Sequence, residues 1–536
     1  MTAGYDYVVV GAGSAGCVLA NRLTEDPGAS VLLLEAGGSD RHPYIQIPLA
    51  MGRLWQRRMF DSGYDTEPEP GLHGRRLPVR RGKVLGGSSS VNVMVYTRGH
   101  RGDFDRWARG GATGWSYADA LPYFKRSESW EGGEDSWRGG TGPLATQSAR
   151  MEDPIHDAWH DAARMVGWKV TGDANGADGV GLGRAQFTIG AGRRASAANA
   201  YLKPALHRPN LTVRTGVLAT RLALRAGRAV GVHFVENRQE SYAEATREVV
   251  LCGGVFGSPQ LLMLSGIGPA EELRALGITP QVDLPVGRNL RDHLAVSLRW
   301  QRTEPGPFQQ AMRLDRVALA MARAWLLRDG PATTLPLGLI AFLRSEPGLD
   351  APDLEIMLGA PPFEASPWFP GWRPGWPDVV GVRPVLLHPR STGAVSLRSA
   401  DPAAPVRIAA GFLSDAEDVA TLRRGFHISR ELALAPALDR FRGALLAPDA
   451  DVRTDADIDA WIRTTAITVN HPLGTCAIGP VVDPELRVHG VDGLRVVDAS
   501  ALPDMPSAHI NAIVMMLAER TSDLIRGRAV LAAANV

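Results

Sequence analysis

The chain has few cysteines and no excess of either charge. Three of its 536 residues are cysteines, Cys17, Cys252 and Cys476, and no two of them form a Cys-x-x-Cys pair. An odd number of isolated cysteines in apolar or glycine-rich stretches argues against a disulfide framework and against a metal site, and it favours a reducing, cytoplasmic compartment. Lys and Arg total 58 against 57 Asp and Glu. This balance gives the chain no electrostatic reason to bind nucleic acid.

Long apolar runs are also missing. A membrane helix needs roughly 20 apolar residues, and the longest candidate, 317–327, is interrupted by Arg323. The first expected strand starts close to Met1, which leaves no room for a signal peptide. We therefore expect no transmembrane segment, while loose association with a membrane surface stays open. One group of arginines is scattered among turns and is expected to form a solvated rim: Arg57, Arg58, Arg75, Arg76, Arg80 and Arg81.

A nucleotide-binding pattern opens the chain. Tyr7–Val10 is typical of a short buried strand, and the motif Gly-Ala-Gly-Ser-Ala-Gly follows at 11–16. Apolar residues then recur at helical spacing, and a second apolar run over 31–34 ends in Glu35. A strand–helix–strand unit of this length is parallel and right-handed, so the pattern predicts the start of a doubly wound sheet.

The glycines of this motif have separate roles. Gly11 makes the tight turn, Gly13 lets the backbone approach a diphosphate, and Gly16 lets the helix pack closely on the strand. The helix N-terminus supplies free N–H donors for the diphosphate, and Glu35 can accept hydrogen bonds from a ribose diol. The motif alone does not distinguish FAD from NAD.

Further blocks are spread over the rest of the chain. Residues 82–92 read Gly-Lys-Val-Leu-Gly-Gly-Ser-Ser-Ser-Val-Asn, and residues 254–268 contain Ser-Pro-x-Leu-Leu followed by Ser-Gly-Ile-Gly. His-Pro-Leu-Gly-Thr-Cys stands at 471–476, and Gly-Leu-Arg-Val-Val-Asp-Ala-Ser at 493–500. In these blocks the sequence resembles the glucose–methanol–choline oxidoreductase family, in particular its bacterial choline-dehydrogenase-like and alcohol-oxidase-like members. Val255 departs from the pattern, which usually has a small residue there.

The resemblance implies an α/β fold, α+β overall, with a Rossmann-like FAD-binding domain and a discontinuous substrate domain. We expect the FAD-binding domain to comprise 1–160, with an excursion over 43–81, then 190–300 and 466–536. Helices and strand-like runs alternate over 301–465, and this segment with 161–189 is expected to form the substrate domain on an antiparallel sheet. Within the second FAD-binding part, residues 210–252 are expected to form paired strands, and a helix is expected to begin over 261–264.

The resemblance also implies the cofactor site. The loop at 86–89 would lie flat against the flavin, with bare N–H groups toward its edge. Some relatives attach the flavin through a histidine at the position of Val91, and because valine cannot do so we expect dissociable, non-covalent FAD. The cofactor-binding residues are expected to be Gly11, Gly13, Ser14, Ala15, Gly16, Glu35, Ala36, Gly86, Gly87, Ser88, Asn92, Val93, Val217, Asp498, Ala499, Asn511 and Ala512.

Two histidines are the expected catalytic pair. Oxidising an alcohol removes a hydroxyl proton as hydride leaves the carbon for flavin N5, and a neutral imidazole is suited to accept that proton. The resemblance assigns this role to His471. His509 would fix the substrate oxygen, and Asn470 lies beside the pair. The reduced flavin would pass its electrons to O₂ or to a separate acceptor, and the oligomeric state stays open.

Alternative functions remain at this stage. A small primary alcohol, such as a hydroxymethyl group on a ring, is favoured, and a choline-type alcohol is the alternative. A flavin-containing lyase of the same superfamily would keep the cofactor without oxidising an alcohol, and a non-catalytic flavin-binding module would be indifferent to loss of His471. The aromatic, proline-rich segment 361–377, which includes Phe363, is a substrate lid, a packed surface loop or a subunit contact.

Overall fold

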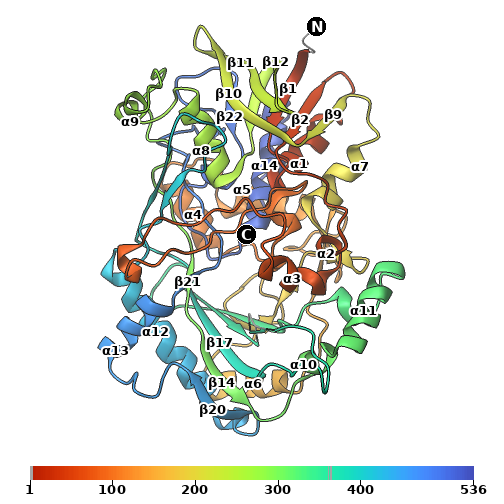
Figure 1. The fold of residues 1–536 in the computed structure, drawn as a ribbon, viewed down its shortest axis with the longest axis vertical. Helices are drawn as coiled ribbons and strands as arrows, with labels where there is room; N and C mark the ends of the chain where they lie inside the picture. The colour runs from red at the N-terminus through yellow and green to blue at the C-terminus, as the bar shows by residue number, and fades with distance from the viewer. Residues whose placement is uncertain (1–3, 360, 363–364) are drawn as a thin grey trace.

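Two β-sheets organise the molecule and lie one above the other in Figure 1. The structure, a computed structural model, describes residues 4–359, 361–362 and 365–536. Each sheet has its own cluster of buried apolar side chains. The chain passes several times between the two halves, so that residues far apart in sequence meet where the halves join.

The upper sheet is the doubly wound sheet that the sequence predicts. Its strand order is β10–β11–β12–β1–β2–β9, with β22 paired to β12. The strands are β1 (Gly4–Val10), β2 (Val31–Glu35), β9 (Leu211–Thr215), β10 (Val217–Arg225), β11 (Arg228–Glu236), β12 (Gln239–Leu251) and β22 (Leu494–Val496). β1, β2, β9, β12 and β22 pair in parallel, whereas β10 and β11 form an antiparallel excursion. The helices α1 (Ser14–Leu23) and α14 (Asn511–Ile525) pack against each other beside this sheet.

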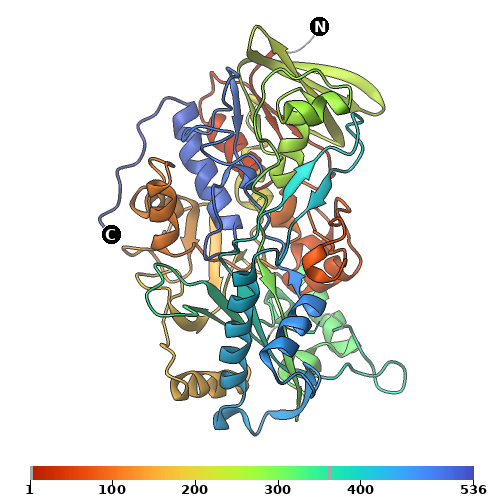
Figure 2. The ribbon, with the colours of Figure 1, turned by 90° about the vertical axis from the view of Figure 1, so that its left-hand side faces the viewer.

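The lower sheet is antiparallel, as expected for the substrate domain. Its order is β20–β14–β17–β16–β15–β5, and β13 pairs with both β17 and β21. The strands are β5 (Gly181–Arg184), β13 (Leu294–Ala295), β14 (Leu298–Arg302), β15 (Leu339–Leu343), β16 (Leu354–Leu358), β17 (Val379–Leu386), β20 (Arg442–Ala447) and β21 (Ile467–Thr468). The helix α12 (Ala416–Ala433) packs on β17, and α13 (Asp455–Thr465) packs beside it (Figure 2). The expected fold class is therefore confirmed.

Three short strands show where the chain changes halves. β13 and β14 begin before residue 301 and β21 lies just after 466, yet all three belong to the lower sheet. The expected division at 300–301 thus falls inside β14. No turn residue separates β13 from β14. The local sequence therefore does not mark the point where the chain enters the lower sheet. β5, which lies within 161–189, pairs with β15 of the lower sheet.

The helix expected to begin over 261–264 instead ends there, because α8 spans Gly254–Leu264. Pro259 lies inside it, and its ring nitrogen cannot donate to the carbonyl of Val255 four residues earlier. That carbonyl instead accepts a hydrogen bond of 2.7 Å from the hydroxyl of Thr475. Thr475 therefore replaces the hydrogen bond that Pro259 cannot make. The helix continues through Pro259, although a proline in the sequence usually predicts the end of a helix.

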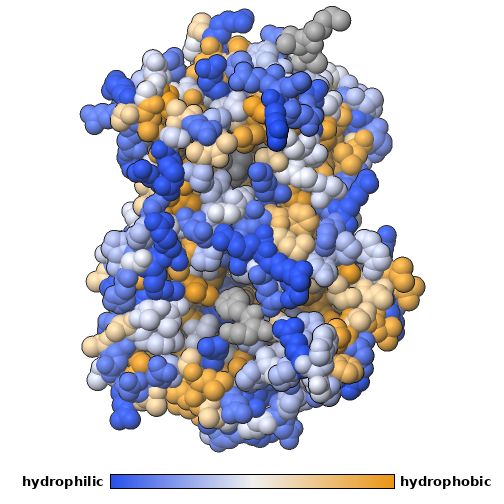
Figure 3. Space-filling model, viewed as in Figure 1, coloured by the Kyte–Doolittle hydropathy of each residue, from blue (hydrophilic) through white to orange (hydrophobic). Residues whose placement is uncertain are grey.

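The 43–81 excursion is less irregular than the sequence predicts, since it contains α2 (Pro43–Gln46) and α3 (Met51–Gln56). α11 (Leu314–Leu326) packs against this excursion through Ala320 and Ala324. It exposes Leu319, Trp325 and Leu326, and Figure 3 shows an apolar area at the right, where Figure 1 places α11. No helix in the described parts of the chain is long and apolar enough to cross a bilayer.

Candidate active site

A cavity of about 470 Å³ opens at the carboxyl ends of β1 and β2 and extends to the two predicted catalytic histidines. In a doubly wound sheet this edge, where the strand order reverses, is where ligands bind. The cavity is lined at one end by Gly11 and Glu35 and at the other by His471 and His509. Its walls come from both halves of the molecule.

Glu35 occupies the nucleotide end of the cavity. Its carboxylate accepts hydrogen bonds from the backbone N–H of Ala12 at 2.8 Å and of Gly37 at 2.7 Å. Burial raises the pKa of Glu35, and the two backbone N–H groups oppose that shift. The carboxylate is thus fixed at the strand end, and further lone pairs remain to accept hydroxyl groups of a ligand.

Glycines form a cradle that suits a dinucleotide. A Cβ on Gly87 would lie 2.7 Å from Cα of Gly13, and one on Gly16 would lie 1.9 Å from the carbonyl oxygen of Gly11. Side chains at these two positions would therefore push the loops apart. A Cβ on Gly13 would meet only the carbonyl of Cys252, at 3.8 Å, so Gly13 faces open space toward the cavity. With the free N–H groups of the α1 N-terminus, this cradle fits a diphosphate.

Most of the predicted cofactor residues line this cavity, and three do not. The exceptions are Gly16, which packs on Gly11, Gly86, and Ala512 in the first turn of α14. Gly86 has a φ of 86°, a conformation that favours glycine and makes the turn into the next residues. The residues that line it are Gly11, Gly13, Ser14, Ala15, Glu35, Ala36, Gly87, Ser88, Asn92, Val93, Val217, Asp498, Ala499 and Asn511.

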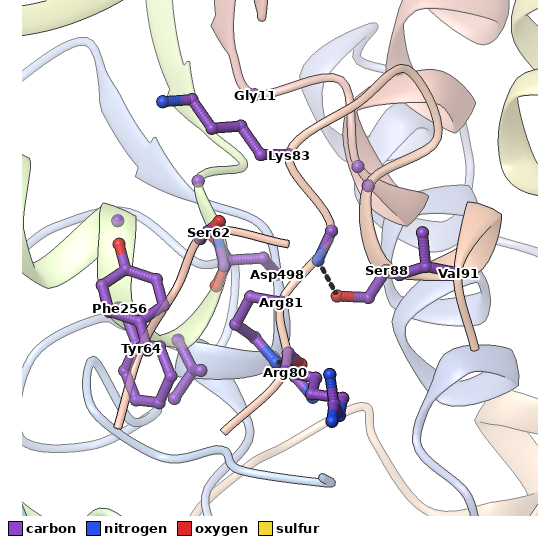
Figure 4. A pocket seen from close by; sticks show the side chains of 18 of the residues that line it. Gly11, Ser62, Tyr64, Arg80, Arg81, Lys83, Ser88, Val91, Phe256 and Asp498 are labelled. Carbon is purple, nitrogen blue, oxygen red and sulfur yellow. Dashed lines mark hydrogen bonds between the residues drawn. The ribbon is translucent and has the colours of Figure 1, made fainter. Parts of the chain in front are cut away.

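Side chains beside the cavity are held by partners from other segments. The hydroxyl of Ser88 accepts from the backbone N–H of Gly82 at 3.2 Å, the dashed line in Figure 4. The amide oxygen of Asn92 accepts from the buried guanidinium of Arg194 at 2.8 Å, and burial lowers the pKa of Arg194 to about 9. Ser14 donates to Asn511 at 2.7 Å, which ties the start of α1 to the start of α14.

Asp498 closes β22 and is fully engaged by protein groups. One carboxylate oxygen accepts from the N–H of Gly254 at 2.8 Å and the hydroxyl of Ser258 at 2.5 Å. The other accepts from the N–H and hydroxyl of Ser500 at 2.8 Å and 2.5 Å. Burial raises the pKa of Asp498. The residue therefore joins the end of β22 to the start of α8 at the cavity wall.

His471 and His509 lie together, as the sequence predicts. Their ring centroids are 4.5 Å apart and both side chains are buried. The backbone N–H of His471 donates to Asp292 at 2.7 Å, and that of His509 donates to the hydroxyl of Thr97 at 2.7 Å. Nε2 of His509 lies 3.0 Å from a carboxylate oxygen of Glu355, which β16 of the lower sheet contributes.

The surroundings keep His471 neutral. Burial is the main cause that lowers its pKa well below the usual value of 6.5, and the charges of His509, His293 and Arg81 act in the same direction. A neutral imidazole in a cavity can accept a proton from a hydroxyl group. The local chemistry therefore suits the role that the sequence assigns to His471.

Three of the arginines expected on a solvated rim, Arg58, Arg80 and Arg81, line the cavity instead. The backbone N–H of Arg80 donates to the amide oxygen of Asn470 at 2.7 Å. The guanidinium of Arg81 donates to the carbonyl of Asn470 at 2.5 Å. Figure 4 shows Arg80 and Arg81 below Asp498. The prolines and glycines that flank these arginines are typical of a surface turn, so the sequence predicted exposed side chains here.

Sequence reasoning missed Asp292, His293 and Glu355. Asp292 and His293 precede β13 directly, and both are buried. An acid and a histidine directly before the apolar residues 294–296 were an available signal, but nothing in their spacing linked them to His471. Glu355 lies on a fully buried strand, where an unpaired carboxylate would be costly. Its partner His509 is 154 residues away, so sequence alone could not pair them.

The described part of the aromatic segment does not reach the cavity. Of its described residues, 361–362 and 365–377, none lines the cavity wall, and Phe363 lies outside the described residues. The indole of Trp368 donates to the carbonyl of Gln309 at 2.8 Å, and Trp376 packs near Phe308. These contacts place the segment against α10 (Pro307–Ala311). In the described part of the chain, no three His, Cys, Asp or Glu residues are placed to hold a metal ion.

Comparison of sequences finds relatives along the whole chain. The family model described as GMC oxidoreductase matches twice, its N-terminal part over residues 5–295 and its C-terminal part over 389–518. The chain is 42% identical over 537 residues to a protein named oxygen-dependent choline dehydrogenase from Brucella ovis, covering 99% of this chain and 97% of that one. A protein of the same name from Photobacterium profundum is 40% identical over 546 residues, 100% of this chain and 95% of the relative.

Solved structures share the fold. Pyridoxine 4-oxidase from Mesorbium loti has a TM-score of 0.87 and 31% identity, covering 98% of this chain and 100% of that one. A formate oxidase structure has a TM-score of 0.89 and 28% identity, with 98% and 99% coverage. A fungal aryl-alcohol oxidase, at 23% identity and a TM-score of 0.85, covering 98% of this chain and 99% of that one, shows the same fold.

Proposed function

Because the chain belongs to the GMC oxidoreductase family and is an FAD-dependent alcohol oxidoreductase, we propose that it oxidises a primary alcohol to the aldehyde with His471 as the proton acceptor. The observation that carries the proposal is the pair of buried rings, 4.5 Å apart, at the end of a cavity that begins at the dinucleotide motif. Bound FAD supplies the acceptor for the hydride that leaves the alcohol carbon. The protein has to hold the hydroxyl group and take its proton.

The two histidines divide this work. His471 is neutral because burial lowers its pKa, and it receives the hydroxyl proton. His509 is anchored by Glu355 through Nε2 and by Thr97 through its backbone, so its ring is fixed beside His471. A fixed ring orients the hydroxyl oxygen, which lowers the entropy cost of reaching the reactive geometry.

The FAD is held without a covalent bond in this proposal. Val91 lines the cavity at the position where some relatives carry the linking histidine, and its aliphatic side chain offers no nucleophile. The glycine cradle, Glu35 and the start of α1 provide the dinucleotide contacts. Denaturing the purified protein should release all of the flavin into solution. Flavin that stays with the denatured chain would contradict this part of the proposal.

A choline-type alcohol is the second candidate substrate. The observation that favours it is the identity of about 40% with proteins named choline dehydrogenases over the full length. A ring-bearing hydroxymethyl compound is the first candidate, since this chain pairs two histidines at the cavity end and also resembles a pyridoxine oxidase structure.

Anaerobic flavin bleaching tests the proposal. The purified, FAD-loaded protein is mixed without oxygen with benzylic, pyridine-ring, aliphatic, sugar and choline alcohols in turn. We expect one class to bleach the oxidised flavin, and admitting air then distinguishes direct reoxidation by O₂ from the need for another acceptor. Flavin that no alcohol bleaches would contradict the proposal and favour a lyase or a binding module.

A further inference from the structure

We propose that His293 is a positioning residue that sets the tautomer of His471 and leaves its Nε2 unprotonated toward the cavity. The inference rests on the proposed function, in which His471 accepts the substrate proton. It concerns a side chain outside the pair predicted from the sequence. A histidine can serve as a base only through a ring nitrogen that carries no proton, so the tautomer decides whether the base is ready.

The carbonyls of Leu387 and Pro506 and the ring of His471 face His293. Two of these contacts have hydrogen-bond geometry, and they fix the protonation of His293. Its Nε2 lies 2.9 Å from the carbonyl oxygen of Leu387, and its Nδ1 lies 3.0 Å from Nδ1 of His471. The ring is fully buried. A carbonyl oxygen can only accept, so Nε2 of His293 carries a proton and donates it. Burial, with the charges of His388 and His509, lowers the pKa of His293 to about 3, so the ring is neutral.

The protonation of His293 determines which ring nitrogen of His471 carries the proton. A neutral His293 that is protonated on Nε2 presents a lone pair at Nδ1, so the short contact between the rings requires His471 to donate from its own Nδ1. A neutral His471 with a proton on Nδ1 has a lone pair on Nε2. This atom has no hydrogen-bond partner among the described residues, and the ring lines the cavity. The substrate hydroxyl can then transfer its proton to Nε2, while Nδ1–H continues to donate to His293.

None of the charged neighbours among the described residues fixes the tautomer of His471 in place of His293. Asp292 accepts from the backbone N–H of His471 and from the hydroxyl of Thr468, and among the described residues it has no hydrogen bond with the His471 ring. The carboxylate of Glu355 pairs with His509, and Asp103 pairs with His388. Arg81 lies nearby and offers only donors. Within the described residues, His293 is therefore the acceptor for Nδ1–H of His471.

Two substitutions of His293 distinguish a role in positioning the His471 ring from a role in packing alone. His293→Leu keeps a side chain of similar size without an acceptor, whereas His293→Asn places an amide oxygen near the former Nδ1. We expect the limiting rate of anaerobic flavin bleaching to fall on the order of 10²-fold in the leucine variant. The apparent affinity for the alcohol should stay nearly unchanged, and the asparagine variant should recover much of the rate. Equal limiting rates in wild type and His293→Leu would overturn the proposal.

A second readout needs no turnover. The ring nitrogens of the FAD-loaded protein, labelled with ¹⁵N in histidine, report which nitrogen carries the proton, and the His471→Ala variant identifies the signals of His471. We expect the Nδ1–H tautomer in wild type and a shift toward Nε2–H in His293→Leu. A wild-type His471 protonated on Nε2 would overturn the proposal whether or not any alcohol is oxidised. Failure of the proposed function would instead appear as unbleached flavin across the alcohol panel.

Discussion

At the residue scale, two glycines three positions apart perform different tasks. A Cβ on Gly16 would collide with the carbonyl of Gly11 at 1.9 Å, so Gly16 serves the fold. A Cβ on Gly13 would meet no protein atom closer than 3.8 Å, so Gly13 serves the ligand. The sequence motif alone predicts both roles. The structure shows that the neighbouring backbone leaves no room for a side chain at Gly16.

Gly13→Val should therefore yield folded protein that lacks FAD. The valine side chain extends into the space left for the diphosphate, while the backbone at this position has an ordinary negative φ of −74°. The ratio of flavin to protein absorbance measures loading, and circular dichroism measures folding. Gly16→Val is the matched comparison and should lose folding as well. Full FAD occupancy in Gly13→Val would contradict the assignment of the cradle.

His471→Ala should retain FAD and lose roughly 10²–10⁴-fold in the rate of flavin reduction, because the substrate proton loses its acceptor. The measurement is stopped-flow bleaching without oxygen. His207→Ala, at an exposed position outside the cavity, is the control and should match wild type. A His471→Ala variant that reduces its flavin at the normal rate would remove this residue from the mechanism.

The pH dependence of flavin reduction follows from the same residue. Burial lowers the pKa of His471 well below 6.5, so its neutral, proton-accepting form predominates throughout the neutral range. The rate should be flat from about pH 7 upward and should fall only as the pH drops through the lowered pKa, where the ring becomes protonated. A rate that climbs steeply through pH 7 to about 9 would point to a base with a higher pKa.

At the element scale, Glu519 fastens four segments together. Its buried carboxylate accepts from Arg22 of α1, from Arg126 of α5 (Tyr117–Ser127), and from the hydroxyl of Tyr201 in the π-helix η4 (Ala198–Leu202). Glu519 itself lies on α14, whose first residues reach the cavity. This cluster therefore holds α14 against the helices that cover the upper sheet.

Glu519→Gln should lower the free energy of unfolding by about 3 kcal/mol, the lower end of the range for breaking a buried ion pair. The lower end applies because Arg22 and Arg126 both reach solvent in part. Chemical denaturation of the FAD-loaded protein measures the change. Glu417→Gln, which removes a partly exposed pair with Arg424, is the control and should change stability by less than about 1 kcal/mol. Equal effects of both variants would contradict the role of Glu519.

Elements could be predicted from the sequence where local pattern and tertiary packing agree. The strand over 7–10, the glycine turn and the helix α1 that follows them agree with the apolar periodicity. The start of α8 was missed because Thr475, far away in sequence, satisfies the carbonyl that Pro259 leaves free. The cavity positions of Arg80 and Arg81 depend on Asn470, which local composition cannot reveal.

At the scale of the whole molecule, the site exists only where the two sheets meet. The upper sheet contributes the cradle and Glu35, and the lower sheet contributes Glu355 from β16 and the approach of His471 from β21. Motif order along the chain could predict that such a site forms, and which histidines it contains. The partners of those histidines, His293 and Glu355, required the packing of the lower sheet against the upper one, which no local pattern encodes.

The most direct test of the central claim is anaerobic flavin bleaching by the best alcohol of the panel, compared with the same alcohol carrying deuterium on its hydroxyl-bearing carbon. Removal of hydride from that carbon predicts bleaching that slows several-fold with deuterium, with one aldehyde formed for each flavin bleached. Bleaching at identical rates for both alcohols would show that breaking this bond does not limit the step. Product formed without bleaching, or no bleaching at all, would contradict the assignment of the cavity as the site of alcohol oxidation.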